Sequence, residues 1–254
     1  MDEIRIPSAS LLLVRDGRAG LEVFLQQRHP AASAFAGALV FPGGKLEPVD
    51  HDPALLRHCR GVAMLDPEER AHRLAAIRET YEESGLLLVE PTQLEAVPVA
   101  ESRDAAGLAA WCRRTGARLA LDRLLPFAHW ITPRGQPQIF DTRFYLAPAP
   151  PGQTARHDGQ EALSGCWLRP AEAIAQAERG SATLVFPTWM ILLRLSGVGD
   201  TDAALALARS LTVVPVRPRI VRQEDGRLVE LPPAAGYGMR VWMAADGRAL
   251  RILA

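Results

Sequence analysis

Three glutamates, Glu79, Glu82 and Glu83, are spaced so that their carboxylates could act together. At about 100° per residue, the i, i+3, i+4 spacing places them within an arc of roughly 100° on one helix face. Carboxylates this close repel one another unless a cation lies among them. Oxygen ligands suit a hard ion such as Mg²⁺ or Mn²⁺, which completes its shell with water and substrate phosphate. The alternative interpretation is an acidic face that is simply solvated.

The helix that would carry these carboxylates has clear start and stop signals. Asp66 is typical of an N-cap, Pro67 of the first helical position, and Glu69 of the third. Gly85 stands where a left-handed residue commonly ends a helix. The apolar residues recur with helical spacing on a separate face: Leu74, Ile77 and Tyr81. The sequence therefore predicts a helix between Asp66 and Gly85 with one apolar and one acidic face.

A second feature is the sequence Phe-Pro-Gly-Gly-Lys at 41–45, which follows a short β-rich run at 38–41. Paired glycines make a tight turn where backbone can approach a ligand closely. A Gly-Gly pair on its own is equally typical of an ordinary turn. The turn and the acidic helix together indicate a phosphate and metal site more strongly than either does alone.

Together the two elements resemble the Nudix box, the signature of hydrolases that cleave nucleoside diphosphates linked to another moiety. The family pattern runs Gly, five residues, Glu, seven residues, then Arg-Glu-apolar-x-Glu-Glu-x-Gly-apolar. Gly44 and residues 78–86 fit it, with three departures. Asp50 replaces the first glutamate, and Thr80 occupies an apolar position. The gap between Asp50 and Arg78 is 27 residues long rather than seven. Loop-closure entropy grows slowly with length, so an insertion between turn and helix is tolerable.

A long insertion inside the box resembles a Nudix subgroup that includes the mammalian peroxisomal coenzyme A diphosphatase. Further matches lie at 25–28, 37–44, 76–80, 130–133 and 140–144, and the resemblance spans roughly residues 9–196. Another Nudix coenzyme A motif is half present, because Ser33 stands where those relatives carry arginine. The resemblance implies an α/β fold, a Nudix-type α/β/α sandwich with a mixed β-sheet. Its Nudix domain would cover 1–211, with a helical insertion at about 51–70, and a β-rich extension would follow at 212–254.

The resemblance also implies roles for the residues of the box. Glu82 and Glu83 would be the main metal ligands, and Glu79 a third ligand or a base. Arg78 would hold a glutamate in place through a bidentate pair. The backbone of Gly43 would add a carbonyl ligand to Mg²⁺ or Mn²⁺.

Residues beside the box are implied to contact substrate. Gly44, with the glycine before it, would let the substrate come close. Arg28 and Lys45 are candidate phosphate contacts, although a surface lysine on a turn is an equal alternative for Lys45. Glu161 lies where many relatives carry a catalytic loop acid, and a surface residue at the start of a strand is its alternative interpretation.

Contacts to a nucleobase have weaker candidates. His129 could stack on a base or bond to it, but a histidine satisfied within the core is the commoner situation. Phe140 and Phe144 share one face of a predicted strand, where core packing is the default and adenine stacking the alternative.

Composition excludes several classes of protein. The 254 residues include 29 Lys and Arg and 29 Asp and Glu, so the formal net charge is zero, which argues against a nucleic-acid or polybasic membrane binder. The three cysteines, Cys59, Cys112 and Cys166, form no CxxC pair and suggest neither zinc nor a disulfide framework. The apolar runs are too short for a signal peptide or a transmembrane helix. We expect a cytoplasmic chain with no membrane or nucleic-acid partner, and the family gives grounds for a homodimer.

The remaining elements alternate between strand and helix, as in mixed α/β or α+β proteins. β-rich runs lie at 8–15, 21–28, 38–41, 124–130, 138–147, 162–168, 219–222 and 227–231, the first two joined by a hairpin at Asp16-Gly17. Further helices are predicted at 102–115, 170–179, 187–196 and 201–210, with a partly helical excursion around 53–60.

The expected function is hydrolysis of a diphosphate linkage that depends on Mg²⁺ or Mn²⁺. Coenzyme A or an acyl-coenzyme A is the favoured substrate, giving 3′,5′-ADP and (acyl-)phosphopantetheine. One alternative is ADP-ribose, NADH or another dinucleotide as substrate. Another is a nucleotide-binding regulator without hydrolysis, against which the presence of all three glutamates counts.

Overall fold

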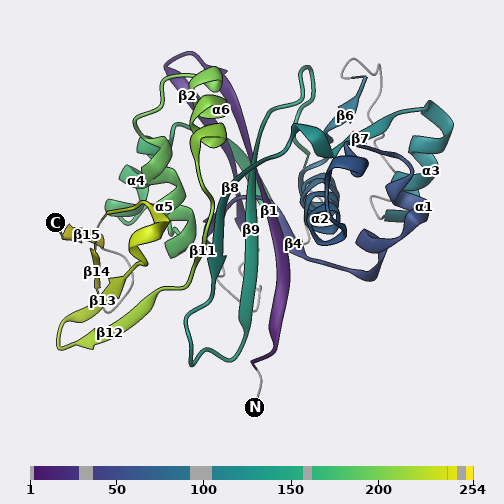
Figure 1. The fold of residues 1–254 in the computed structure, drawn as a ribbon. Helices are drawn as coiled ribbons and strands as arrows, with labels where there is room; N and C mark the ends of the chain where they lie inside the picture. The colour runs from purple at the N-terminus through teal and green to yellow at the C-terminus, as the bar shows by residue number, and fades with distance from the viewer. Residues whose placement is uncertain are drawn as a thin grey trace.

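The computed structural model describes residues 3–28, 37–91, 105–156, 162–238, 240–244 and 250–253. An eight-stranded sheet lies at its centre, in the order β10-β2-β1-β9-β8-β11, with β3 paired to β2 and β4 to β1 (Figure 1). Its strands are β1 (Arg5–Gly17), β2 (Gly20–Arg28), β3 (Leu39–Val40), β4 (Gly43–Lys45), β8 (Leu125–Ile131), β9 (Ile139–Pro148), β10 (Ala162–Leu168) and β11 (Pro215–Val216). The β1–β9 and β8–β11 pairs are parallel and the other pairs antiparallel, so the sheet is mixed as predicted.

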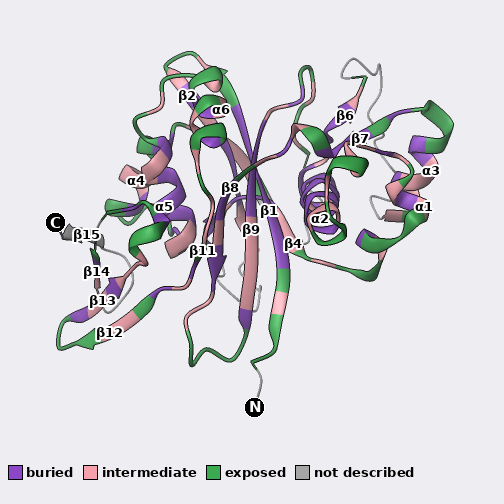
Figure 2. Ribbon diagram, viewed as in Figure 1, coloured by how far each residue is buried: buried purple, intermediate pink, exposed green. Residues whose placement is uncertain are grey.

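Helices cover both faces of this sheet (Figure 1). One face carries α2 (Pro67–Ser84), with α1 (Pro53–Leu56) and α3 (Ala105–Thr115) farther out; the other carries α4 (Pro170–Glu178), α5 (Phe186–Leu195) and α6 (Thr201–Ser210). Successive side chains of β1 alternate between the two faces. Leu11 and Leu13 pack in the α2-side core, and Leu12 and Val14 in the α5-side core. Figure 2 shows the middle of β1 coloured as buried. The predicted α/β/α sandwich is confirmed. Among the helices of the described residues, none is both long and apolar enough to span a bilayer.

Helix α2 forms as its sequence predicts. The Asp66 carboxylate caps it by accepting a hydrogen bond of 2.8 Å from the backbone N–H of Glu69. Gly85 ends it in a left-handed conformation with φ of 72°. Its predicted apolar face, Leu74, Ile77 and Tyr81, is buried in the α2-side core.

The insertion between β4 and α2 folds together with the chain that follows α2. It contains η1 (Pro48–His51), α1, β5 (Cys59–Arg60) and η2 (Val62–Met64), and the chain after α2 supplies β6 (Val89–Glu90), β7 (Arg118–Ala120) and η3 (Leu121–Arg123). β5, β7 and β6 form a three-stranded sheet. The excursion predicted around 53–60 is helical in α1 only.

The C-terminal residues pack against the α5 side of the molecule. β12 (Arg219–Gln223), β13 (Gly226–Glu230), η4 (Pro233–Ala235), β14 (Arg240–Ala244) and β15 (Leu250–Leu253) include a second, four-stranded antiparallel sheet. The Arg194 guanidinium lies 4.0 Å from the ring centre of Tyr237, whose ring lies 5.6 Å from that of Trp130. The two strands predicted in this region are present.

Two local predictions differ from the structure in detail. The predicted hairpin between the first two strands is present, but its turn lies at residues 18–19 rather than at Asp16-Gly17, because Gly17 already pairs with Gly20. The predicted short strand does end before Pro42, because β3 stops at Val40, but the glycines that follow form β4 rather than a turn, and their extended backbone pairs with Ser8–Ser10 of β1. Helix α3 begins at Ala105, and residues 102–104 of its predicted range lie outside the described residues.

Candidate active site

β4 brings the paired glycines between β1 and the carboxylates of α2. The backbone N–H of Gly43 donates to Glu83 Oε2 at 2.9 Å. Gly43 has φ of 151°, and a Cβ there would lie 2.3 Å from the carbonyl oxygen of Ala9. A Cβ on Gly44 would lie 2.4 Å from Cδ of Glu79. Glycine is therefore required at both positions, at Gly43 by the backbone of β1 and at Gly44 by a carboxylate.

This difference predicts opposite outcomes for two matched alanine substitutions. Gly44→Ala displaces only the flexible end of Glu79, so Mn²⁺ affinity falls while the free energy of unfolding changes by less than about 0.5 kcal/mol. Gly43→Ala meets backbone in a strained conformation and costs about 1–3 kcal/mol of stability. Urea unfolding and electron paramagnetic resonance of bound Mn²⁺ measure the two quantities. Wild-type Mn²⁺ affinity in Gly44→Ala would show that Glu79 does not hold the metal.

Arg78 forms ion pairs with three carboxylates of the site. Its side chain is 2% exposed and forms a bidentate pair with Asp50, Nε to Oδ1 and Nη2 to Oδ2, both at 2.9 Å. Its Nη1 donates to Glu79 at 3.0 Å and to Glu82 at 2.9 Å. Burial disfavours the charge, but the paired carboxylates outweigh it and raise the pKa of Arg78 above its ordinary value. The prediction that Arg78 forms its bidentate pair with a glutamate is wrong. Its bidentate partner is Asp50, and Glu79 and Glu82 each accept one hydrogen bond from Nη1.

Asp50 is the partner that sequence reasoning missed, although it was visible as a departure from the family pattern. Its carboxylate is fully buried, and Oδ2 also accepts from the backbone N–H of Glu47 at 2.8 Å. The short helix η1 carries Asp50 against α2, so a side chain one methylene shorter than glutamate still reaches Arg78.

Glu82 is the most exposed of the three box glutamates, with 27% of its side chain accessible. Burial raises its pKa to about 7, against the attraction of Arg78 and with added repulsion from Glu79. A positive charge placed beside this carboxyl would favour its ionised form.

Glu83 is held by two donors on one oxygen. Besides Gly43, the side-chain amide of Gln26 donates to Oε2. Gln26 is buried, and its Oε1 has no hydrogen-bond partner among the described residues. Arg28 lies two residues along β2, on the same face, and its buried Nε likewise has no partner in the part of the chain that the structure describes. These orphaned polar atoms beside the acidic face indicate where water or a ligand would bind.

The donor set fits a hard divalent cation. Glu79, Glu82 and Glu83 offer only oxygen, which suits Mg²⁺ or Mn²⁺, and Gly44 leaves room for the Glu79 carboxylate. Within the described ranges, no three acidic, histidine or cysteine side chains already converge on one point. Glu79 and Glu82 turn to Arg78 and Glu83 turns to β4, so a cation would have to draw them together.

The structure does not place the side chains of two other predicted residues, Lys45 and Glu161, within the site. Lys45 is exposed, and it is its carbonyl that contacts the site, accepting from Arg78 Nη2 at 3.1 Å. Glu161 lies outside the described residues. Its described neighbours are anchored beside the site: Arg156 N–H donates to the Ser84 carbonyl at 2.7 Å, and Ala162 pairs with Arg28.

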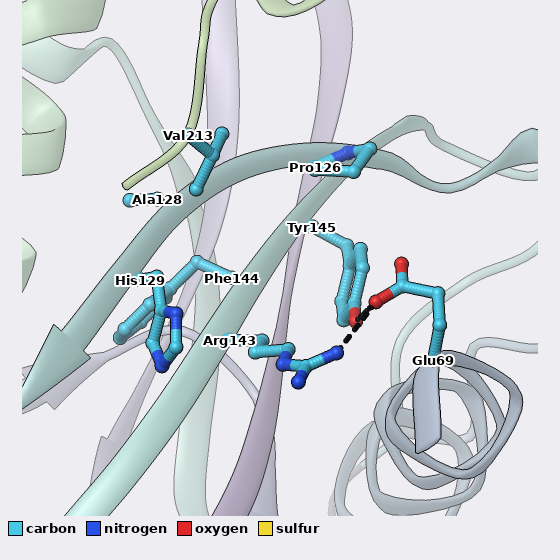
Figure 3. A pocket seen from close by; sticks show the side chains of 8 residues that line it. All are labelled: Glu69, Pro126, Ala128, His129, Arg143, Phe144, Tyr145 and Val213. Atoms are coloured by element: carbon cyan, nitrogen blue, oxygen red, sulfur yellow. Dashed lines mark hydrogen bonds and ion pairs between the residues drawn. The ribbon is translucent and has the colours of Figure 1, made fainter. Parts of the chain in front are cut away.

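A cavity of about 180 Å³ lies near the other end of α2, on the same side of the sheet (Figure 3). Its lining residues are Glu69, Pro126, Ala128, His129, Arg143, Phe144, Tyr145 and Val213. Glu69 accepts from Arg143 Nη1 at 2.8 Å and from the Tyr145 hydroxyl at 3.1 Å, while its other oxygen accepts from Arg73. Burial would raise the pKa of Glu69, but Arg73 and then Arg143 and Tyr145 hold it below its ordinary value. The described residues of this pocket thus hold an ionised carboxylate that is already fully paired.

His129 lines the same pocket and is oriented by Asp141. Its Nε2 bonds to Asp141 Oδ1, and Arg5 donates to the other oxygen at 3.1 Å. Burial would raise the pKa of Asp141, but the bonds from His129 and Arg5 hold it below its ordinary value. An ionised acceptor requires the proton on Nε2, which leaves Nδ1 of the neutral ring as an acceptor. His129 is therefore half-buried at the edge of the pocket and is not a histidine enclosed within the core.

A family model, the NUDT19 Nudix domain, matches residues 57–195, more than half of the chain, which include the box helix but not the glycine pair. An acyl-coenzyme A diphosphatase NUDT19 from Gallus gallus is 27% identical over 70% of this chain, and a putative nudix hydrolase 7 from Caenorhabditis elegans is 28% identical over 71%. The chain spans 62% and 57% of the length of these two relatives.

A solved structure gives the same result. The crystal structure of a NUDIX hydrolase from Alicyclobacillus acidocaldarius superposes with a TM-score of 0.72 at 27% identity, covering 85% of this chain and all of that one. With the box helix, the mixed sheet and the family match in agreement, the chain belongs to the Nudix hydrolases and carries a Nudix domain of the NUDT19 type.

Proposed function

We propose that this Nudix hydrolase cleaves the diphosphate linkage of coenzyme A or an acyl-coenzyme A, giving 3′,5′-ADP and (acyl-)phosphopantetheine. The observation that carries the proposal is the set of box glutamates on α2, packed against the glycines of β4, in a chain whose relatives include an acyl-coenzyme A diphosphatase. Because the chain spans less than two thirds of those relatives, their activity supports the substrate and does not establish it.

The residues of the site divide into ligands and positioning groups. Glu79, Glu82 and Glu83 would hold Mg²⁺ or Mn²⁺ together with the Gly43 carbonyl. When bound, such an ion neutralises charge on the diphosphate and lowers the pKa of a coordinated water. Arg78 restrains two of the carboxylates through a single nitrogen. The bidentate pair with Asp50 holds the guanidinium of Arg78 in place, so its position does not depend on the presence of substrate.

Substrate contacts would come from the strand side of the site. The buried Nε of Arg28, which has no partner among the described residues, is a donor suited to a phosphate oxygen. Lys45 is exposed at the end of β4 and supplies a mobile positive charge. Glu161 is the proposed general base.

A substrate panel tests this function. Purified protein is incubated with Mg²⁺ or Mn²⁺ and coenzyme A, acetyl-coenzyme A, ADP-ribose, NADH or diadenosine diphosphate, and products are identified by mass. The expected result is 3′,5′-ADP from both coenzyme A compounds, with kcat/KM at least about tenfold above the others. Equal turnover of ADP-ribose or NADH would overturn the substrate assignment. Nucleotide binding without phosphate-bond cleavage in every case would instead identify a non-catalytic regulator.

A further inference from the structure

We infer that the pocket formed by β8, β9 and the N-terminal half of α2 binds the nucleobase of the substrate. The inference rests on the proposed function, because it takes the diphosphate to lie at the glutamates of α2. It adds a recognition site that lies apart from those glutamates and whose residues play no part in bond cleavage.

The pocket and the glycines belong to one row of paired residues across the sheet. Gly44 pairs with Ala9, Ala9 with Arg143, and Arg143 with His129. Residues paired across strands point to the same face, and here that face carries α2. Neighbouring strands lie about 4.8 Å apart, so Arg143 lies roughly 10 Å from Gly44. That is the order of the separation between diphosphate and base in a nucleoside diphosphate.

The charges of the pocket select a neutral group rather than a second phosphate. Arg143 is engaged by Glu68 and Glu69, and Asp141 by Arg5 and His129. A phosphate entering here would meet the ionised carboxylate of Glu69, and the one arginine among the described lining residues, Arg143, is already paired with carboxylates. A cavity of about 180 Å³ is also below the roughly 300–1,000 Å³ of sites for drug-sized ligands. It suits a single ring system.

Two features of the lining recognise a flat heterocycle. Nη1 and Nη2 of Arg143 already donate to Glu69 and Glu68, so a base would meet this guanidinium by stacking on its planar face rather than by accepting from these nitrogens. Nδ1 of His129 takes no part in the Asp141 contact and has no partner in the described structure, and in the neutral ring with the proton on Nε2 it can accept a hydrogen bond such as an exocyclic amine would supply. Figure 3 shows Arg143 between the imidazole and Glu69, with apolar Val213 and Pro126 on the opposite side.

Calorimetry without metal tests the pocket independently of hydrolysis. The ligands are 3′,5′-ADP and ribose 5-phosphate, which lacks a base. His129→Leu removes the acceptor, and Val213→Trp fills the cavity from the loop after α6. Both are expected to weaken 3′,5′-ADP binding about tenfold or more, and to leave ribose 5-phosphate binding unchanged. His58→Leu, in the insertion, is the matched control and is expected to bind 3′,5′-ADP like wild type.

The outcomes separate this inference from the proposed function. Equal 3′,5′-ADP affinity in wild type, His129→Leu and Val213→Trp overturns the nucleobase site, whatever the enzyme hydrolyses. Loss of affinity for both ligands also overturns it, because the effect would then be independent of the base. A loss of affinity for 3′,5′-ADP alone supports the nucleobase site even if the wild type cleaves no diphosphate. In that case only the proposed hydrolysis is overturned. Near-ultraviolet circular dichroism of both variants verifies the fold.

Discussion

Glu82→Gln is expected to lower kcat for the preferred diphosphate by about 10²–10³-fold, because a metal ion acting on a phosphoryl group is worth several kcal/mol of barrier. The substitution keeps the size of the side chain and removes one charged oxygen ligand. Stability should change little. The Glu82 carboxylate gains a bond from Arg78 but is also desolvated and repelled by Glu79.

Three measurements distinguish a metal ligand from a structural residue here. Mn²⁺ affinity by electron paramagnetic resonance is expected to fall together with kcat, while the urea midpoint stays at the wild-type value. Glu178→Gln, the same chemical change on an exposed position of α4, is the matched control and should alter neither. Unchanged Mn²⁺ affinity and turnover in Glu82→Gln would mean that the acidic face is merely solvated.

The sequence predicted the helix of the site well, because its signals are local. Asp66, Gly85 and the apolar face of α2 lie within one element, and capping and periodicity act over a few residues. The family pattern then assigned the glutamates. The pattern also placed Arg78 beside a glutamate, but neither source revealed the contacts that Gln26 and Asp50 make in the site. Gln26 reaches Glu83 across 57 positions of the chain, and Asp50 reaches Arg78 across 28.

The glycines show why local signals can mislead. Gly-Gly after proline is typical of a turn, yet β1 offers backbone partners that local propensity does not contain. The resulting strand is possible only because Gly43 lacks a side chain where β1 passes. For Gln26 a signal existed, since a polar residue two positions after the buried Phe24 points to the α2 face of β2.

The expanded box also has a structural explanation that loop entropy alone does not give. The insertion is tied to the chain beyond α2: Arg60 pairs with Asp122 at 2.8 Å, and Arg118 donates to the Cys59 carbonyl. β5 joins the small sheet with β7 and β6. The extra residues thus pack, with the chain beyond α2, into the core on the α2 side of the sheet, and η1 still places Asp50 against Arg78.

Arg78→Met is the second large expected effect, a loss of about 3–5 kcal/mol in the free energy of unfolding. Methionine preserves length and packing but leaves the Asp50 carboxylate buried at 0% exposure without its cation. The backbone N–H of Glu47 would remain as a hydrogen-bond donor to Asp50. Because Glu79 and Glu82 also lose a shared donor, turnover should fall by about 10–100-fold, the usual cost of losing a group that orients metal ligands.

A double-mutant cycle tests whether the pairing with Asp50 is the cause. Asp50→Asn removes the buried negative charge and can still accept from Glu47, so Arg78→Met/Asp50→Asn should be more stable than Arg78→Met alone. Urea unfolding of the four proteins gives the coupling energy, expected to be at least about 1 kcal/mol. Losses that simply add would show that Arg78 stabilises α2 through packing, not through charge. In either case turnover should stay low in the double variant, because asparagine at position 50 does not replace the donor that Glu79 and Glu82 share.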